Sequence, residues 1–385
     1  MTQTQKNPQA KDFGFGEEQQ MLKEASLRFF TDKAPLEHLR KHTAGTEDPY
    51  LGAERPPVYD QDAWQEMVQL GWTALAVPEA AGGAGMNLVT AVGVVEEIGR
   101  AAAPTPLSST LLATFVLREA DTPEALRWLG KIAEGGSAAL AIFPEDGSLT
   151  LDTSDVSATN NTLSGTSYFV QDLNKVDFLV VAAKDASGVG LYCVERTADG
   201  VTCQADRIVD LTRDQGRVTF NNVAAECVAP PRQEPGKGAD VLHRSLPALL
   251  TLISADIAGG CEWLLQATAD YAKERVQFER PIGFFQAVKH PIVNMMITVD
   301  ETRSLVYNAA CAYDSGADDA LRCAYLAKSS ASDTAEFCAN RGTQLHGGIG
   351  FTWEVDVQIY HKRQMHSQQL FGDGIWQRQQ LAELL

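Results

Sequence analysis

The chain has 385 residues, 44% of them hydrophobic and 21% charged, with a formal net charge of −18. This composition excludes a disordered polar chain, and the length predicts two or three domains rather than a single core. The acidic balance argues against nucleic acid or an anionic membrane as the main partner, but leaves room for an anionic ligand in a local basic pocket.

The cysteines and the N-terminal sequence predict a cytoplasmic protein. Seven cysteines are scattered along the chain, without a Cys-x-x-Cys pair or a Cys/His spacing that suits zinc. Dispersed thiols in an odd number fit a reducing compartment. The N-terminus has no apolar signal core, and no run of 18 apolar residues occurs in the chain. We therefore expect neither a metal site nor a membrane span.

The first part of the sequence, residues 1–135, predicts a helical domain. Apolar residues recur at helical spacing in four stretches, residues 17–30, 63–69, 88–100 and 107–135, the last of which supplies two helices. The Gly82-Gly83-Ala84-Gly85 run indicates a tight turn rather than a phosphate loop, because no strand–loop–helix pattern surrounds it.

The middle of the chain, residues 136–238, predicts an all-β module of sandwich or barrel type. After Gly135-Gly136 the pattern changes to short buried-strand runs separated by turn signals. The expected strands cover residues 138–142, 163–170, 178–183, 190–194 and 216–220.

Residues 239–385 predict a C-terminal helical domain. Three long stretches with apolar stripes cover residues 246–273, 291–313 and 321–342, and helices of this length pack as a four-helix bundle. The expected fold class is therefore multidomain α+β. An N-terminal α-helical domain is followed by a β-barrel or sandwich and then by the bundle.

The stretch Arg275–Met295, between the first two long helices, contains side chains suited to binding a ligand. Its helical pattern breaks at a proline and a nearby glycine and then resumes, which predicts a helix–turn–helix hairpin. Arg275 offers a fork of donors suited to phosphate, Phe278 and Phe285 offer flat faces, and Gln286 can donate and accept. Such an end fits a bulky anionic ligand with a flat ring, and it equally fits a surface turn between packed helices.

A second stretch of this kind begins at Gln344. Glycines at 347, 348 and 350 let a backbone approach a ligand closely. Taken alone, this run is more typical of a helix C-cap followed by a turn.

Both stretches resemble acyl-CoA dehydrogenases. The pattern R-x-Q-F-x-x-P-I-x-x-F-Q-x-V-K-H over residues 275–290 is close to the C-terminal-domain signature of that family. In the N-terminal domain, G-W-x-x-L-x-V-P-E-x-x-G-G-x-G followed by E-E-I-G-R is similar as well, and Gly165…Phe169-Val170 resembles the family's middle β-barrel. The resemblance covers nearly the whole chain.

The resemblance implies FAD as cofactor, with its ADP part bound by a neighbouring subunit. Carried over motif by motif, the FAD-binding candidates are Arg275, Phe278, Gln286, Gln344, Gly347 and Gly348. The implied reaction is α,β-dehydrogenation of an acyl-CoA thioester, in which a carboxylate removes the α-proton and hydride passes to the flavin. Electron-transfer flavoprotein is the implied acceptor of the electrons.

The chain departs from the family at the catalytic base. Phe371 stands where many members carry the Glu of a Tyr-Glu-Gly-Thr run, and Asp373 stands in place of the Thr. Another branch places its Glu on the helix before the hairpin, where this chain has Leu249 or Leu250. Asp256 is the nearest acid in that helix, and either a base or a polar contact to another helix explains it.

The β-domain departs as well, and three interpretations follow. The family's Thr-Glu-Pro-x-x-Gly-Ser-Asp flavin loop is replaced by residues 142–148, IFPEDGS. The chain is a complete dehydrogenase with Asp256 as base, a base-less subunit that lends its FAD motifs to a partner, or a non-catalytic scaffold. The second explains both what is kept and what is lost. The chain resembles bacterial α2β2 acyl-CoA dehydrogenases that act on steroid side chains, which implies a second dehydrogenase-like subunit.

Overall fold

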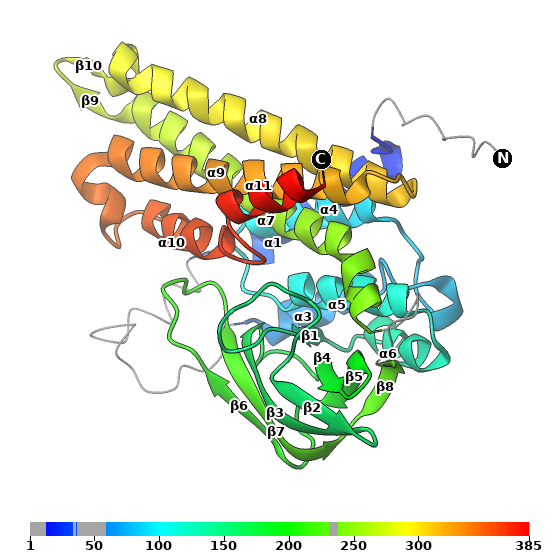
Figure 1. Ribbon diagram of the computed structural model, residues 1–385. Coiled ribbons are helices and arrows are strands. Elements are labelled where there is room, and N and C mark those ends of the chain that lie inside the picture. Colours follow the sequence, from blue (N-terminus) through cyan, green and yellow to red (C-terminus); the bar gives the residue numbers. More distant parts are fainter. Residues whose placement is uncertain (1–12, 34–35, 37–58, 231–237, 385) are drawn as a thin grey trace.

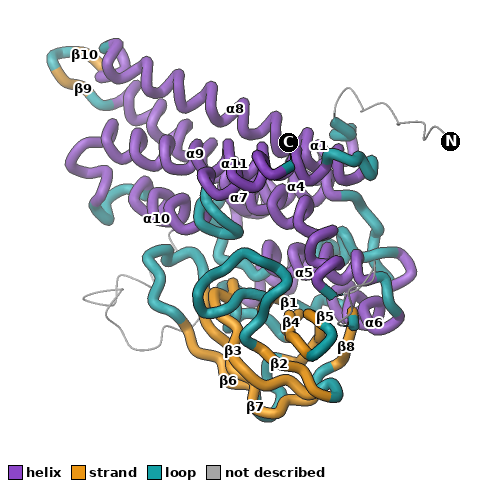
Figure 2. The backbone as a smooth tube through the Cα atoms, viewed as in Figure 1, coloured by secondary structure: helices purple, strands orange, loops and turns teal. Residues whose placement is uncertain are grey.

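The computed structural model describes residues 13–33, 36, 59–230 and 238–384 (Figure 1). It confirms the predicted order of helices, a β-domain and a helical bundle, with the long helices at one end of the molecule and the sheet at the other (Figure 2). Helix changes to strand between Ala133 and Ala138, and strand changes back to helix between Ala229 and Ala239. The division into domains at 135/136 and 238/239 stays a prediction.

The N-terminal helices build their own core and also contact the bundle. They are α1 (Glu17–Lys33), α3 (Gln61–Gln69), α4 (Leu88–Arg100), α5 (Leu107–Ala120) and α6 (Pro123–Ala133). Helix α4 is buried on nearly all sides because α1 packs on one face and α7 (Ala239–Glu274) on another. A short helical turn, η1 (Glu79–Ala81), ends at Gly82 with φ of 83°, so the glycine run is the tight turn that the sequence predicts.

The β-domain is one eight-stranded sheet that curves around an apolar core (Figure 1). Its strands are β1 (Ala138–Ala141), β2 (Val156–Thr159), β3 (Thr162–Gln171), β4 (Phe178–Asp185), β5 (Gly188–Glu195), β6 (Val201–Ala205), β7 (Gln215–Ala224) and β8 (Glu226–Ala229). They are joined in the order β6-β7-β3-β2-β4-β5-β8, and β1 pairs in parallel with β4. The three strands that the sequence did not predict, β2, β6 and β8, have only four or five residues each, many of them polar or small.

The bundle consists of three long helices and two short ones. They are α7, α8 (Gln286–Asp314), α9 (Ala320–His346), α10 (Val357–Ser367) and α11 (Gly374–Glu383). Helix α7 begins about two turns before the predicted start at 246, since it accommodates Pro247 in its interior. It is long and apolar enough to cross a membrane, but 83% of its apolar window is buried inside the fold, so the protein's own core accounts for its hydrophobicity.

Helices α4 and α7 touch backbone to backbone. A Cβ atom added at Gly99 would lie 2.0 Å from the carbonyl oxygen of Asp256, and one at Gly259 would lie 1.9 Å from that of Glu96. Only glycine allows this approach, because any side chain would force the helices apart. The contact fixes the height of α7 beside α4, and with it the position of Asp256.

Candidate active site

The hairpin between α7 and α8 presents its ligand-like residues to the outside. Strands β9 (Val276–Gln277) and β10 (Arg280–Pro281) pair antiparallel and are joined by a two-residue turn, Phe278-Glu279. Both turn residues have positive φ, which is the backbone conformation of the two-residue turns common in β-hairpins. The ring of Phe278 is 85% exposed although it is apolar. It meets Phe285 edge to face at 6.0 Å between centroids. The predicted helix–turn–helix hairpin is therefore confirmed.

The glycine turn after α9 lies at the same end of the bundle. Helix α9 ends at His346, and Gly347 follows with φ of 64°. Tyr271, one turn before Arg275, stacks on the ring of His346 at 4.4 Å and donates a hydrogen bond to its carbonyl oxygen at 3.4 Å. Burial lowers the pKa of His346, so this ring packs as a neutral group. The stack joins the hairpin to the glycine turn.

This joined end of the bundle is open and has spare hydrogen-bonding capacity. Its six predicted ligand residues, Arg275, Phe278, Gln286, Gln344, Gly347 and Gly348, are all exposed. A Cβ atom at Gly347 or Gly348 would meet nothing within 4 Å, so their backbone faces free space. Within the described part of the chain, the Arg275 guanidinium forms no ion pair. An unpaired arginine beside an open glycine backbone suits a phosphate-bearing ligand.

The loop that carries Phe371 has the opposite character. Phe371 is 9% exposed and meets Phe143 of the β-domain edge to face, with 4.9 Å between the ring centroids. One residue on, a Cβ atom at Gly372 would lie 2.9 Å from Leu149. The loop after α10 and the loop after β1 are thus packed together by apolar contacts.

The β-domain side of this contact is also aromatic. Phe143 forms an isolated bridge with Tyr168, and the carbonyl oxygen of Phe143 accepts from the Tyr168 amide at 3.0 Å. The neighbouring Phe169 has φ of 56° and lies 3.6 Å from where Gly147 would carry a Cβ atom. Aromatic rings dominate this place, and the hydroxyl of Ser167 donates to the same carbonyl oxygen of Phe143 at 3.2 Å.

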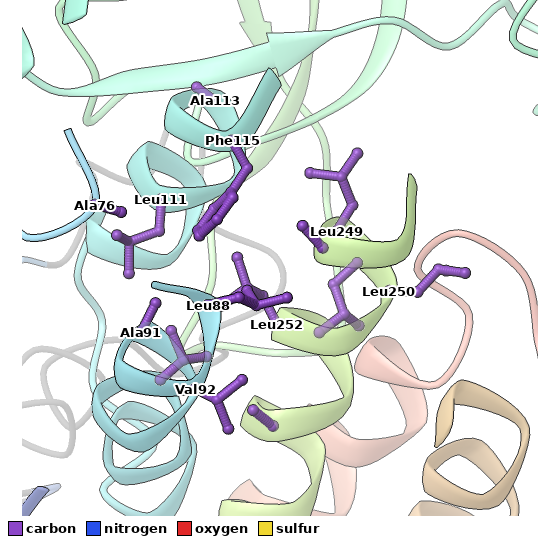
Figure 3. Close-up of a cluster of buried hydrophobic side chains, with 14 of the residues drawn as sticks. Ala76, Leu88, Ala91, Val92, Leu111, Ala113, Phe115, Leu249, Leu250 and Leu252 are labelled. Carbon is purple, nitrogen blue, oxygen red and sulfur yellow. The ribbon is translucent and has the colours of Figure 1, made fainter. Parts of the chain in front are cut away.

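The alternative base position is buried in the apolar core. Leu249 and Leu250 are both fully buried on α7. Figure 3 shows the side chain of Leu249 in a cluster with Phe115 of α5 and Leu88 of α4. A charged group at this position would lose its hydration among hydrocarbon side chains, at a large desolvation cost.

The comparisons with known proteins identify this architecture. Residues 236–385 match the family described as acyl-CoA dehydrogenase, C-terminal domain, and residues 16–136 match acyl-CoA dehydrogenase, N-terminal domain. The acyl-CoA dehydrogenase IpdE2 of Mycobacterium tuberculosis (strain ATCC 25618 / H37Rv) is 34% identical over 81% of this chain and 83% of the relative. This chain belongs to the acyl-CoA dehydrogenase family.

Solved structures extend the similarity over nearly the full length of the chain. A variant of the Tcur3481-Tcur3483 steroid ACAD is 29% identical, with a TM-score of 0.83, and covers 96% of this chain and 98% of that one. The ChsE4-ChsE5 complex from Mycobacterium tuberculosis is 25% identical, with a TM-score of 0.83, over 97% of this chain and 98% of that one. The helical, β and bundle regions of this chain therefore follow the order of the family.

Asp256, the one acid considered as a replacement base, is held by two arginines. Its carboxylate accepts from Arg213 at 2.7 Å and from Arg363 at 2.7 Å, and its exposed fraction is 3%. Next to this pair, burial would raise the pKa of Asp210, but His366 and Arg363 hold it well below its usual range. Of the two explanations that the sequence left open for Asp256, the geometry matches the polar contact to another helix.

Three histidines of the bundle serve as packing and hydrogen-bonding groups. His346 donates to the carbonyl oxygen of Gly342, His361 contacts Thr343, and His366 contacts Gln215, at 2.8, 2.9 and 3.1 Å. Across the described ranges, no cluster of three or more His, Cys, Asp or Glu side chains is arranged to hold a metal ion.

Acyl-CoA dehydrogenases use FAD, and the two regions of this chain fit it differently. The open end offers an unpaired guanidinium and bare glycine backbone, which fit the pyrophosphate of the ADP part. The position of Phe371 itself offers an aromatic ring in place of a carboxylate, so it cannot supply the base that works beside the reactive end of the cofactor. Sequence analysis missed two residues at these places. Tyr271 donates to the carbonyl oxygen of His346 and Lys328 to that of Gly372, and each of these partners lies more than forty positions along the chain.

Proposed function

We propose that this chain is the base-less subunit of a heteromeric, FAD-dependent acyl-CoA dehydrogenase. The complex carries out the α,β-dehydrogenation of an acyl-CoA thioester and passes electrons to an electron-transfer flavoprotein. One observation carries the proposal, which is the contrast between an open, unpaired nucleotide end and an apolar, closed position where the base would be.

The open end supplies half of a flavin site. Arg275 and Gln344 donate to the pyrophosphate, Phe278 and Gln286 line the nucleotide, and Gly347 and Gly348 allow its close approach. Their exposure supports this role, since a ligand bound there lies partly outside this chain and is completed by a second subunit. Each pair of unequal subunits then holds one complete flavin.

The closed position supports a partner that supplies the base. A base must reach the α-carbon of the substrate as an ionised carboxylate. Phe371 cannot take a proton, Leu249 and Leu250 are in the core, and Asp256 is already neutralised by two arginines. The working Glu therefore belongs to the partner, and the interpretation of Asp256 as base loses its support.

A surface suited to that partner lies on α8 beside the hairpin. Val293, Met296 and Ile297, one turn apart on this helix, are 46–53% exposed, and Phe351 after α9 is 73% exposed. Apolar residues at this spacing form a continuous stripe that water disfavours, and such stripes mark protein contacts. A scaffold function does not explain why this stripe adjoins the open nucleotide end.

The relatives suggest the substrate class and the kind of assembly. Each of the two solved structures is named for a pair of different proteins, Tcur3481-Tcur3483 in one and ChsE4-ChsE5 in the other. The first is described as a steroid ACAD. We extend this to an α2β2 complex that acts on a steroid side-chain CoA. All seven cysteines of this chain are free thiols, which supports a reducing cytoplasm as its place of work.

Co-expression tests the proposal. This chain is produced alone and together with a second acyl-CoA dehydrogenase chain that carries the family Glu, and each product is assayed for mass, flavin per chain and turnover. We expect a yellow α2β2 complex from the pair and flavin-free protein from the single chain. A fully flavinated, active homotetramer of this chain alone would refute the proposal.

A further inference from the structure

Lys328 is a buried lysine that none of the chemistry above uses. It lies on α9 with an exposed fraction of 0%. Its ammonium donates to Ser332 Oγ at 2.8 Å, to the carbonyl oxygen of Gln368 at 2.9 Å and to that of Gly372 at 2.8 Å. A lysine is almost never fully buried unless it is paired, and here neutral oxygens satisfy all three of its donors.

The two carbonyl groups that Lys328 holds lie on either side of Phe371. The loop between them is unusual, because Phe371 has φ of 55° and Gly372 has φ of 92°. A phenylalanine rarely adopts this left-handed conformation unless its surroundings impose it. Gln377 on α11, also fully buried, adds a third anchor by donating to the carbonyl oxygen of Phe371. Every anchor points at the backbone around one ring.

We propose that Lys328 is the positioning residue of the Phe371 loop. It holds the backbone of residues 368–373 so that the Phe371 ring closes against Phe143, and it does so through hydrogen bonds rather than through charge. This deepens the proposed function and rests on it in one respect, that the closed position makes this chain the base-less subunit. The positioning itself concerns this chain alone.

The hydrogen-bonding pattern suits either protonation state of the amine. Burial lowers the pKa of Lys328 to about 7, opposed by the charge of Asp373. A neutral amine keeps two N–H donors for the carbonyls of Gln368 and Gly372. The Ser332 hydroxyl, which donates to the Gln368 carbonyl oxygen at 3.2 Å, can turn to donate to the amine lone pair instead. The clamp therefore persists on both sides of the pKa.

Other charged groups near this part of the bundle are engaged elsewhere. Arg378 of α11 pairs with Asp333 of α9 at 2.6 Å and donates to Ser329, on the neighbouring turn. On α10, His366 contacts Gln215 and Arg363 pairs with Asp256. From α8, the groups that contact α9 include the neutral Thr302 hydroxyl. Asp373 remains as the charge that acts on the Lys328 amine.

Amide hydrogen exchange of the full co-expressed complex tests the positioning. The peptides of interest cover residues 368–373 and 142–149. Lys328→Met should speed exchange in both by ~10-fold, the factor that corresponds to about 1.4 kcal/mol, since the variant removes two hydrogen bonds to the loop backbone at once. Phe371→Ala should speed exchange in 142–149 only, because the anchors on the 368–373 backbone stay in place. If Lys328→Met loosens both peptides and Phe371→Ala loosens only 142–149, Lys328 acts on 142–149 through Phe371.

The pH profile separates hydrogen bonding from charge. After correction for intrinsic exchange rates, protection of residues 368–373 in the unaltered chain should stay level from about pH 6 to about pH 9, across the pKa of about 7. A loss of protection above that pKa would show that the charge holds the loop and would overturn the proposal.

A matched control and a second variant keep the test decisive. Lys175→Met removes another buried lysine, which pairs with Asp172 in the β-domain at 3.0 Å, and should leave residues 368–373 unchanged. If Lys328→Met does not fold, Gln377→Met, which releases the carbonyl oxygens of Phe371 and Gly372 from the Gln377 amide, should still loosen 368–373 and 142–149 together. The proposal is overturned if the folded variant leaves both peptides protected, or loosens α9 and α10 as much as the loop. Both results can be read whether or not the complex binds FAD.

Discussion

In an acyl-CoA dehydrogenase, two regions of the helical bundle would contact one cofactor. In this chain the two regions differ in exposure, polarity and hydrogen bonding. The end that contains Arg275 and Gly347 is exposed, polar and unpaired. The loop that contains Phe371 is buried, aromatic and anchored by two interior side chains, Lys328 and Gln377. Under the proposed function, the difference teaches that a fold can keep the binding half of a shared site while its catalytic half becomes packing. Four changes test that separation, in order of expected effect.

Of the four changes, Asp256→Asn should lower the free energy of unfolding the most while leaving turnover unchanged. The change keeps the shape of the side chain but leaves Arg213 and Arg363 without their carboxylate, and breaking a buried pair in this way costs about 3–5 kcal/mol. Urea unfolding of the purified complex should show this loss, while turnover per flavin stays near that of the unaltered complex. A fall of ~10²–10⁴-fold in turnover with unchanged unfolding would instead make Asp256 the base and this chain the catalytic subunit.

Replacing Phe371 with Ala should open the closed region without making it functional. Truncating a buried phenylalanine costs about 3 kcal/mol at the lower end of its usual range, which suits a ring that keeps some exposure. Flavin per complex should not rise, because the space left by the ring is still lined by the aromatic residues Phe143 and Tyr168 and gains no cationic group for the pyrophosphate. Urea unfolding and the flavin spectrum measure the two effects. Extra bound flavin in the variant would show that Phe371 alone blocks a second site.

Replacing Arg275 with Ala should weaken cofactor binding at the open end. A charge-assisted contact to phosphate is worth about 1.5–3 kcal/mol, so the affinity of the complex for FAD should fall roughly ten- to a hundredfold. Flavin retained after dilution and gel filtration measures the loss. Arg280→Ala on the same hairpin is the matched control, because that guanidinium lies over the Phe284 ring at 4.4 Å. Equal retention in both variants would reduce Arg275 to a surface residue.

The sequence predicted most of the fold because its signals are local. Helical periodicity located the long helices, and the proline and glycine after Glu274 located the hairpin. The start of α7 and the strands β2, β6 and β8 were missed, since the first turns of the helix are less apolar than the rest and the strands are too short and polar for a pattern. These elements are set by tertiary packing, which overrides local propensity.

The candidate site divides in the same way. The exposed ligand residues sit in two short motifs, so their types and spacing were visible in the sequence. The role of Asp256 was not, because its partners Arg213 and Arg363 lie 43 and 107 positions away. Lys328 gave no signal either, since a lysine among alanines and serines looks like a surface residue until the loop 44 positions later is folded onto it.

Replacing Gln344 with Ala should produce the smallest effect and the sharpest comparison within the open end. Gln344 is exposed at the last turn of α9 and would make a neutral hydrogen bond, worth about 0.5–1.5 kcal/mol, so FAD affinity should fall roughly two- to tenfold. Asn340→Ala removes an exposed amide one turn earlier on the same helix face and should leave the affinity unchanged. Flavin titration of the two complexes measures the difference. If Gln344→Ala weakens binding as much as Arg275→Ala, the charge of Arg275 does not make its contact stronger than the neutral contact of Gln344. If it weakens binding no more than Asn340→Ala, the nucleotide site lies on the hairpin alone, without the turn after α9.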